Sequence, residues 1–348
     1  MKIALIAPPF IPVPPKKYGG TELFIAELAR RLQSQGLEVT VYTVGESKLD
    51  APIRWLYEKG QWPLKGEVDG TVKALSHASW AVQDAAQDCD IIHLNSAPAV
   101  SFSRFVATPV VHTVHHAYEK EFAEYYRMFP DVSYVTISDF QRRALPMPKM
   151  RTIRHGIDPL LYPLRKEKQN YFSFLGRIAP PKGTHLAIEI ARKTGIPLKI
   201  AGEIQPMYQS YWESKVKPHV DGKFIEYLGE MDLREKIDFL GNSMAMLFPI
   251  QWDEPFGLVM IEAMACGTPV LALSGGAVNE VVKEGVSGCI RSSVDDLVEC
   301  ARDIAFNPQT IRAYMEEFFS VDRMTRDYIA LYTEIQQNGV KEVEQIVA

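Results

Sequence analysis

The spacing of apolar residues changes twice near the start of the chain. Residues 2–9 (KIALIAPP) form a short continuous apolar run that ends in two prolines, which predicts a buried strand. Residues 22–36 (ELFIAELARRLQSQG) carry apolar side chains at helical spacing and end in Gly36, which predicts a helix and its stop. Residues 38–44 (EVTVYTV) predict a second strand, so the three segments together indicate a parallel βαβ unit.

The same alternation of short apolar runs and helical segments continues along the chain. A polar stretch at 157–170 (IDPLLYPLRKEKQN) interrupts it and indicates a linker. An amphipathic pattern at 321–335 (VDRMTRDYIALYTEI) predicts a final helix with no strand after it. The remaining predicted strands lie at 90–95, 108–116, 132–138, 171–178, 198–203, 224–230, 245–250, 268–274 and 288–291. The first three of them are continuous apolar runs, which indicates parallel strands buried on both faces.

The length of the chain favours two domains. It has 348 residues, and a domain commonly holds roughly 100–200. The pattern predicts an α/β fold of two doubly wound, Rossmann-like domains at 1–160 and 161–320, followed by a helical segment at 321–348. Ligands of such sheets bind at the carboxyl ends of the strands, so functional residues are expected in the loops that follow strands.

Composition and charge exclude several classes of protein. Hydrophobic residues make up 47% and charged residues 23%, as in ordinary globular chains. The formal net charge of -5 argues against a nucleic-acid partner, because phosphate backbones favour a basic surface. No run approaches the ~18 apolar residues of a membrane span. The basic segment 142–155 (RRALPMPKMRTIRH) is interpreted as a solvated surface, which leaves at most peripheral membrane contact.

The four cysteines, Cys89, Cys266, Cys289 and Cys300, do not follow metal-ligand or redox-motif spacing. Cys266 and Cys289 lie among apolar residues and are expected to be small buried hydrophobic side chains. The N-terminal run MKIALIAPPF is too short and too rich in proline for a signal peptide. These observations predict a reducing environment and a cytoplasmic location.

Glycines and cations lie beside two of the predicted strands. In the segment YGGTE, Gly19 and Gly20 would let a ligand approach the backbone next to a helix N-terminus, although an ordinary glycine hinge explains the segment equally well. In the segment GRIAPPKG, Arg177 and Lys182 share one strand-end loop and suit a diphosphate better than they suit two solvated charges. The sequence has no G-x-G-x-x-G after its first strand and no Walker loop, which disfavours a dehydrogenase or a P-loop enzyme.

The stretch WDEPFGLVMIEAMACGTPV (252–270) holds two glutamates in an apolar setting. Pro255 disfavours an α conformation at Glu254, which is therefore expected in a loop just before a helix. Glu262 would lie about one turn into that helix, where the hydroxyls of a ribose could satisfy its carboxylate. A satisfied glutamate beside an unrelated loop acid is the alternative. The free N–H groups at the helix start, which would form an anion site, belong to Phe256, Gly257, Leu258 and Val259.

The segment HTVHH ends another predicted strand. Strand alternation sends His112 and His115 to opposite faces of the sheet. A histidine at a strand end can bind a substrate or move a proton, but a structurally satisfied histidine is more common. No carboxylate or cysteine completes a local ligand set, so no metal is expected. Asp88 and Asp90 have the D-x-D spacing of a divalent-metal site, but they precede a strand and therefore lie at the wrong end of the sheet.

Taken in order, these segments resemble the retaining glycosyltransferases of family four (glycosyl transferases group 1). Besides the segments above, RHGIDPLLY, IAGE and YLGE carry the resemblance, and EPFGLVMIE matches the family's E-x7-E element. The resemblance covers nearly the whole chain. It implies the GT-B architecture of two Rossmann-like domains facing a central cleft, with the acceptor on the N-terminal side and the donor on the C-terminal side.

The resemblance also implies an activity. A sugar would pass from a nucleotide-diphosphate sugar, UDP-glucose by family habit, to an acceptor hydroxyl without a metal cofactor. Glu254 would contact the transferred sugar, Glu262 would hold the ribose, and His116 would lie near the acceptor. The final helix would return to the N-terminal domain. Catalytic roles would fall to Glu254, His115, Arg177 and Lys182, and donor binding to Gly19, Gly20, Arg177, Lys182, Phe256, Gly257, Leu258, Val259 and Glu262.

Two positions depart from the family's pattern. His155 stands where relatives often have asparagine, and His116 stands where they often have aspartate. The acceptor therefore stays open among a growing glycan, a lipid-linked sugar and a small molecule. No residue is placed as a covalent nucleophile, which favours attack on the same face as the leaving group. A sugar-nucleotide epimerase, a phosphorylase and a non-catalytic nucleotide-sugar-binding protein are the alternatives.

Overall fold

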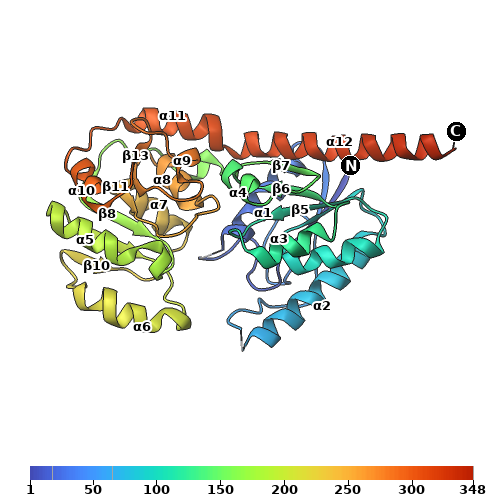
Figure 1. Ribbon diagram of the computed structural model, residues 1–348, viewed down its shortest axis with the longest axis horizontal. Coiled ribbons are helices and arrows are strands. Elements are labelled where there is room, and N and C mark those ends of the chain that lie inside the picture. The colour runs from blue at the N-terminus through green and yellow to red at the C-terminus, as the bar shows by residue number, and fades with distance from the viewer. Residues whose placement is uncertain (18, 65, 348) are drawn as a thin grey trace. The chain divides into compact units, whose positions relative to one another are not determined.

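The computed structural model describes residues 1–17, 19–64 and 66–347, with side chains as far as Asn338. Tyr18, which opens the YGGTE segment, lies outside the described residues. The chain divides into two compact units, and each is built on one parallel sheet covered by helices (Figure 1). Unit 1 holds Met1–Pro15, Gly19–Gly156 and the segment from Val321 onward, and unit 2 holds residues 16–17 and Ile157–Ser320.

Unit 1 contains a seven-stranded parallel sheet in the order β3-β2-β1-β4-β5-β6-β7. Continuous apolar runs form its central strands, as predicted, because helices cover both faces of a parallel sheet. The elements are β1 (Lys2–Ile6), α1 (Gly20–Ser34), β2 (Glu38–Thr43), β3 (Ile53–Trp55), α2 (Glu67–Ala85), β4 (Ile91–Leu94), β5 (Val110–Val114), α3 (Lys120–Arg127), β6 (Ser133–Thr136), α4 (Asp139–Ala144), β7 (Met150–Thr152) and α12 (Val321–Val347).

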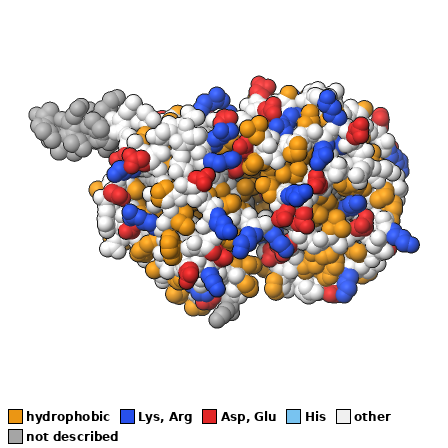
Figure 2. All heavy atoms as spheres, turned by 180° about the vertical axis from the view of Figure 1, so that it is seen from behind, with side chains coloured by type: hydrophobic (Ala, Val, Ile, Leu, Met, Phe, Trp, Pro, Cys, Tyr) orange, Lys and Arg blue, Asp and Glu red, His pale blue; other side chains and the backbone are white. Residues whose placement is uncertain are grey.

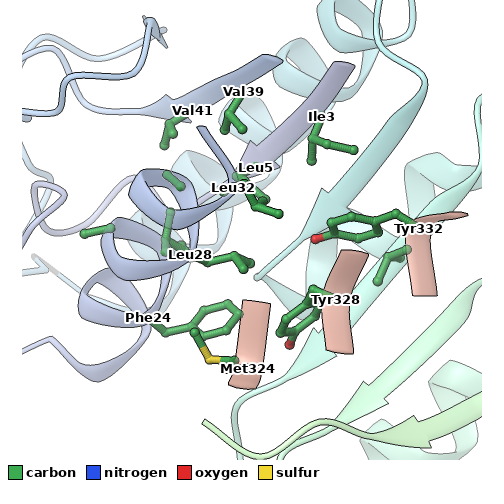
Figure 3. Close-up of a cluster of buried hydrophobic side chains, with 14 of the residues drawn as sticks. Ile3, Leu5, Phe24, Leu28, Leu32, Val39, Val41, Met324, Tyr328 and Tyr332 are labelled. Carbon is green, nitrogen blue, oxygen red and sulfur yellow. The ribbon is translucent and has the colours of Figure 1, made fainter. Parts of the chain in front are cut away.

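Strand β1 separates the two cores of unit 1. Ile3 and Leu5 belong to a buried cluster that includes side chains of α1 and α12 (Figure 3). Ala4 and Ile6 belong to a second cluster, which includes side chains of α2 and α3. Successive side chains of a strand point to opposite faces, so one apolar run supplies both cores.

Unit 2 contains a six-stranded parallel sheet in the order β10-β9-β8-β11-β12-β13. Every strand predicted after residue 170 is present in it. Its elements are β8 (Gln169–Leu175), α5 (Thr184–Thr194), β9 (Leu198–Ala201), α6 (Gln209–Tyr211), β10 (Ile225–Tyr227), α7 (Leu233–Asn242), β11 (Ser243–Phe248), α8 (Leu258–Ala265), β12 (Val270–Leu273), α9 (Val278–Val281), β13 (Gly288–Arg291), α10 (Val294–Arg302) and α11 (Pro308–Phe319).

Helix α12 belongs to unit 1 and packs against α1. The amphipathic pattern predicted a helix to residue 335, and the helix extends to Val347. Its buried side chains include Met324, Tyr328 and Tyr332, which recur at spacings of four. Figure 3 shows Met324 and Tyr328 beside Phe24 of α1.

Three features differ from the expectations drawn from the sequence. The edge strands β3 and β7 have three residues each, so their apolar patterns were too short to predict them. The segment 142–155 is more than a solvated surface, since it includes the end of α4 and all of β7. Cys289 is buried but forms a disulfide with Cys300, which joins β13 to α10. The strand-to-helix packing that brings these two sulfurs together has no signature in cysteine spacing.

Charges of both signs share the surface. On the face shown in Figure 2, Lys and Arg side chains are interspersed with Asp and Glu side chains. This mixture agrees with the formal net charge of -5. No helix among the described residues is long and apolar enough to cross a membrane.

Candidate functional site

The strand order of unit 2 reverses between β8 and β11, which lie side by side. In an open parallel sheet, such a reversal leaves a crevice at the carboxyl ends of the two strands, where ligands bind. The loop after β8 carries Arg177 and Lys182, and the loop after β11 carries Glu254. Three of the residues predicted from the sequence therefore lie at this reversal point.

Glycine allows the two loops to touch. Gly183 has φ +73°, and a Cβ there would lie 1.9 Å from the carbonyl oxygen of Pro249 in the loop after β11. The N–H of Gln251 donates to the carbonyl of Pro181 across the same contact, at 2.8 Å. A larger residue than glycine at 183 would force the loops apart.

Lys182, Glu254 and Trp252 form a compact charged cluster. Lys182 Nζ lies 2.6 Å from Glu254 Oε2, and the Trp252 indole N–H donates to the same oxygen at 3.0 Å. The Lys182 ammonium also lies 4.5 Å from the centre of a Trp252 ring, within reach of a cation–π interaction. Glu254 is only 6% exposed, so its charge depends on these partners. The cluster holds the carboxylate in one orientation.

A third loop fixes the backbone of Glu254. Gly276 follows β12 with φ +57°, and a Cβ there would lie 2.3 Å from the backbone N and O of Glu254. The N–H of Ala277 donates to the Glu254 carbonyl at 2.8 Å. Loops from three neighbouring strands thus converge on this residue, as expected of a site that needs a fixed geometry.

Arg177 supplies a second cation at the end of β8. Its Nε is buried and has no hydrogen-bond partner among the described residues. A buried, unsatisfied donor on a charged group is costly, and an anionic ligand would relieve that cost. Arg177 is therefore suited to bind an anion.

The start of α8 provides backbone donors. The helix begins at Leu258 with Gly257 as its N-cap in the left-handed conformation, so Glu254 lies in the loop just before it, as predicted. The amides of the first turn have no partner inside the helix, and the helix dipole adds partial positive charge there. The predicted donor amides of Phe256, Gly257, Leu258 and Val259 lie at this helix start.

Glu262 lies inside α8 and is 2% exposed. Its Oε1 pairs with Lys236 of α7 and accepts a hydrogen bond from the Tyr162 hydroxyl at 3.0 Å. The sequence predicted that the hydroxyls of a ribose could satisfy this carboxylate, but two protein groups already bond to it. None of the described residues bonds to Oε2, so the ribose role stays a prediction.

In unit 1, His115 directly follows β5. Its Nε2 lies 2.9 Å from the Asn95 side-chain oxygen, and its ring packs on Phe24 at 5.0 Å. Burial holds the pKa of His115 well below its usual 6.5, and the neighbouring ring of His155 lowers that pKa further. The imidazole is therefore neutral at physiological pH and serves as one donor and one acceptor.

The other two histidines of HTVHH are occupied by protein groups. His112 contacts Tyr126 on the sheet face opposite Phe24, as strand alternation predicted. His116 bonds the Ala117 carbonyl at 2.7 Å and the Tyr126 hydroxyl at 2.7 Å. Both ring nitrogens of His116 are thus engaged, and its acceptor role stays a prediction.

Three other predicted residues of unit 1, Gly19, Gly20 and Asp90, lie at the ends of regular elements. Gly19 is the N-cap of α1 with φ +150°, and Gly20 is its first residue. Asp90 directly precedes β4 and accepts a hydrogen bond from the Lys2 N–H at 2.7 Å, so it lies at the amino end of the sheet. Within the described residues, no group of three or more His, Cys, Asp or Glu side chains could hold a metal ion.

Sequence reasoning missed several partners of the predicted residues. Trp252 was visible beside Glu254 in the sequence, but nothing indicated that its indole would bond the carboxylate. Lys236 and Tyr162 lie 26 and 100 positions from Glu262, so only the fold brings them together. Asn95 directly follows β4 and His115 directly follows the adjacent strand β5, so strand adjacency is the signal that could have found this partner.

Two family models match the chain. The model described as Glycosyltransferase Family 4 matches residues 18–159, and the model described as Glycosyl transferases group 1 matches residues 163–316. Among curated relatives, glycogen synthase of Mycobacterium tuberculosis is 26% identical over 271 residues. That match covers 68% of this chain and 63% of the relative, so the chain spans less than two thirds of that protein's length.

Solved structures of similar fold include AviGT4, a glycosyltransferase involved in avilamycin A biosynthesis. It superposes with a TM-score of 0.73 at 22% identity, over 97% of this chain and 98% of that one. HepE from Anabaena, in complex with UDP-glucose, superposes with a TM-score of 0.74 at 18% identity, over 96% of this chain and 100% of that one. These likenesses confirm the two-domain α/β fold predicted from the sequence.

Proposed function

Since the chain belongs to the group 1 glycosyltransferases and has their GT-B fold, we propose that it is a retaining hexosyltransferase. It moves a sugar from a nucleotide-diphosphate sugar to an acceptor hydroxyl. The donor proposed is UDP-glucose, because HepE, which shares the fold, is seen in complex with that compound. The acceptor proposed is a carbohydrate, a lipid-linked sugar or a small molecule.

One observation carries this proposal. A buried carboxylate, Glu254, is held by Lys182 and Trp252 at the point where the strand order of unit 2 reverses. Arg177 and the first turn of α8 belong to loops at the same reversal point. This arrangement offers positive charge for a diphosphate and a fixed acceptor for sugar hydroxyls, which are the two halves of a sugar nucleotide.

The proposed chemistry depends on charge at the leaving group. As the bond from the sugar to the diphosphate breaks, negative charge grows on the phosphate oxygens and positive charge grows on the sugar. Arg177, Lys182 and the α8 amides stabilise the first charge, and Glu254 orients the sugar. The acceptor attacks on the face that the diphosphate leaves, and the departing phosphate takes its proton. No step of this mechanism requires a metal.

Glu262 has a separate role in this proposal. Lys236 and Tyr162 hold its Oε1, which fixes the rotation of the carboxylate inside α8. A ribose hydroxyl would donate to Oε2. The ion pair with Lys236 offsets the cost of keeping the charge buried before the donor binds.

A thermal-shift screen across nucleotide sugars tests donor binding. A donor at ~100 times its dissociation constant should stabilise the protein by roughly 2.7 kcal/mol. UDP-glucose should raise the melting temperature more than GDP-mannose does. No shift with any nucleotide sugar would contradict the proposal.

Turnover distinguishes the alternatives. Release of UDP from UDP-glucose should persist in EDTA, and products should be the same with and without inorganic phosphate. Phosphate dependence would indicate a phosphorylase, and interconversion of the donor sugar would indicate an epimerase. Tight binding without turnover on any acceptor would indicate a non-catalytic binding protein.

A further inference from the structure

His155 lies at the end of unit 1 and is 3% exposed. Helix α12 holds the backbone around it. The Arg323 guanidinium donates to the carbonyls of Arg154 and His155, the latter at 3.0 Å. The next residue, Gly156, directs its N–H at the Met324 sulfur at 3.1 Å. The segment that carries His155 is therefore fixed from one side by two successive residues of α12.

The rings of His155 and His115 are stacked. Their centroids lie 5.5 Å apart, and the ring planes differ by 12°. Phe24 of α1 contacts both, at 4.9 Å from His155 and 5.0 Å from His115. Figure 3 shows the Phe24 ring beside Met324 and Tyr328 of α12. Three aromatic rings thus pack together, and only one of them belongs to a residue with a proposed role in the reaction.

Hydrogen bonds decide which nitrogen of His115 is available. The Asn95 amide N–H donates to the Ile6 carbonyl at 3.3 Å, which turns its oxygen toward His115. That oxygen accepts from Nε2–H of His115 at 2.9 Å. In a neutral imidazole the other nitrogen, Nδ1, is then an acceptor. Among the described residues none bonds to this Nδ1.

Several titratable groups lie near this pair. His112 and His116 come from β5 and the residue positions just after it, His93 comes from β4, and Arg323 and Tyr328 come from α12. Burial and then the Arg323 charge lower the pKa of His155 to about 3. Burial lowers the pKa of His115 first, and His155 is the next largest cause. The neighbouring histidines all lower the pKa of His115 and so disfavour a proton on its ring.

We propose that His155 is a positioning residue that holds the His115 ring in place by stacking and shields it from water, so that Nδ1 remains an acceptor for a substrate hydroxyl. Protonation of Nδ1 would convert that acceptor into a donor and reverse the hydrogen bond. The proposal rests on the proposed function for the identity of the substrate. The geometry of the stacked pair does not depend on it.

The first experiment measures the ring itself, without substrate. Nitrogen-15 NMR of the full chain follows the tautomer and the pKa of His115 in the parent, in His155→Phe and in His155→Ala. His155→Ala removes the stacked ring and admits water, so the pKa of His115 should rise by about one unit or more. His155→Phe keeps an aromatic ring in the stack, so the Nε2–H tautomer should persist. If the His155→Ala variant does not fold, His155→Asn is measured in its place.

His77→Phe is the matched control. His77 is another buried histidine of unit 1, but it lies on α2, whose side chains belong to the second core cluster. Its substitution should leave the signals of His115 unchanged. If the His115 signals titrate in His155→Ala as they do in the parent, the proposal is overturned.

The second experiment measures turnover with UDP-glucose as the probe. In His155→Ala, kcat should fall by about tenfold or more, while KM for UDP-glucose changes by less than about threefold. The acid limb of the kcat/KM profile should move to higher pH. His155→Phe should retain kcat within about threefold of the parent. Equal losses in the two variants would contradict positioning by stacking. If the parent shows no turnover, the proposed function fails, and the NMR experiment still decides this inference.

Discussion

Lys182 Nζ and Glu254 Oε2 lie 2.6 Å apart although the two residues follow different strands, β8 and β11. These strands are adjacent in the sheet, and the strand order reverses between them. The ion pair thus joins the two loops that border the crevice of unit 2. The Lys182 ammonium carries three N–H groups and the Glu254 carboxylate accepts one of them, so two N–H donors remain for a ligand.

Removing both members of this pair should cost less stability than the sum of the losses from removing each member alone. Glu254→Gln leaves Lys182 without its counter-charge, and Lys182→Met leaves Glu254 as a buried, uncompensated carboxylate. Each single variant should lower the free energy of unfolding by roughly 3–5 kcal/mol, and the double variant by less than the sum. Urea unfolding of the four proteins measures the coupling energy.

Arg177→Ala should reduce turnover with little effect on stability, because its Nε has no partner among the described residues. Loss of one preorganised donor typically lowers kcat by a factor of about 10²–10³. Steady-state kinetics with UDP-glucose measures the change. Arg192→Ala is the control, because that arginine lies exposed on α5 of the same unit. Unchanged turnover in both Arg177→Ala and Glu254→Gln would refute the proposed roles.

Alanine substitutions at two glycines would distinguish the effect of backbone strain from the effect of a contact between loops. Gly183 and Gly195 have φ of +73° and +74°, so alanine is strained equally at both. Only Gly183 approaches another loop, since a Cβ there would lie 1.9 Å from the Pro249 oxygen, whereas nothing lies within 4 Å of one at Gly195. Gly195→Ala should cost about 1 kcal/mol and keep donor binding.

Gly183→Ala should cost more and should also weaken donor binding, because the loop after β11 must move away from β8. Thermal shifts with and without UDP-glucose measure both effects. Equal behaviour of the two variants would show that the contact with Pro249 does not position the site.

The central strands and the loop positions of the site residues could be predicted, because residues close by in the sequence determine them. Pro255 placed Glu254 before a helix, and that helix begins at Leu258. Arg177 and Lys182 share a strand-end loop because one short apolar run ends just before them. Residues of this kind are fixed by their neighbours in the sequence.

The partners of the site residues could not be predicted, because tertiary packing supplies them. Glu262 is satisfied by Lys236 and Tyr162, which no spacing rule connects to it. The disulfide between Cys289 and Cys300 depends in the same way on how α10 packs on β13. A buried polar residue in a sequence indicates that a partner exists, but it does not tell whether that partner is protein or ligand.

The tyrosines of α12 should contribute to stability through a buried chain of hydrogen bonds. The Tyr332 hydroxyl bonds His93 Nδ1 at 2.7 Å, and His93 Nε2 bonds the Thr113 hydroxyl at 2.7 Å. Tyr332→Phe leaves a buried ring nitrogen of His93 without its partner, which should cost about 1–3 kcal/mol. Tyr118→Phe, at a side chain that is 48% exposed, is the control and should change stability by less than about 0.5 kcal/mol. Equal midpoints of urea unfolding for the two variants would contradict this role.

Glu22 should make the stability of the protein depend on pH near neutrality. It lies in the first turn of α1 and is 5% exposed, and burial raises its pKa from 4.5 to about 7, opposed only by its own backbone N–H. Because the folded pKa is above the unfolded one, the folded state holds the proton more tightly. The stability that this proton provides is complete below about pH 4.5 and is lost as the pH rises to about 7.

A shift of this size corresponds to roughly 3 kcal/mol. Glu22→Gln stays neutral throughout, so between about pH 5 and about pH 8 it should lose roughly 2.5 kcal/mol less stability than the parent loses. Urea unfolding at the two pH values measures the difference. Glu38→Gln, at an exposed glutamate of β2 in the same unit, should change it by less than about 0.5 kcal/mol. If Glu22→Gln and the parent lose stability in parallel, the Glu22 carboxyl is not the group that titrates in this range.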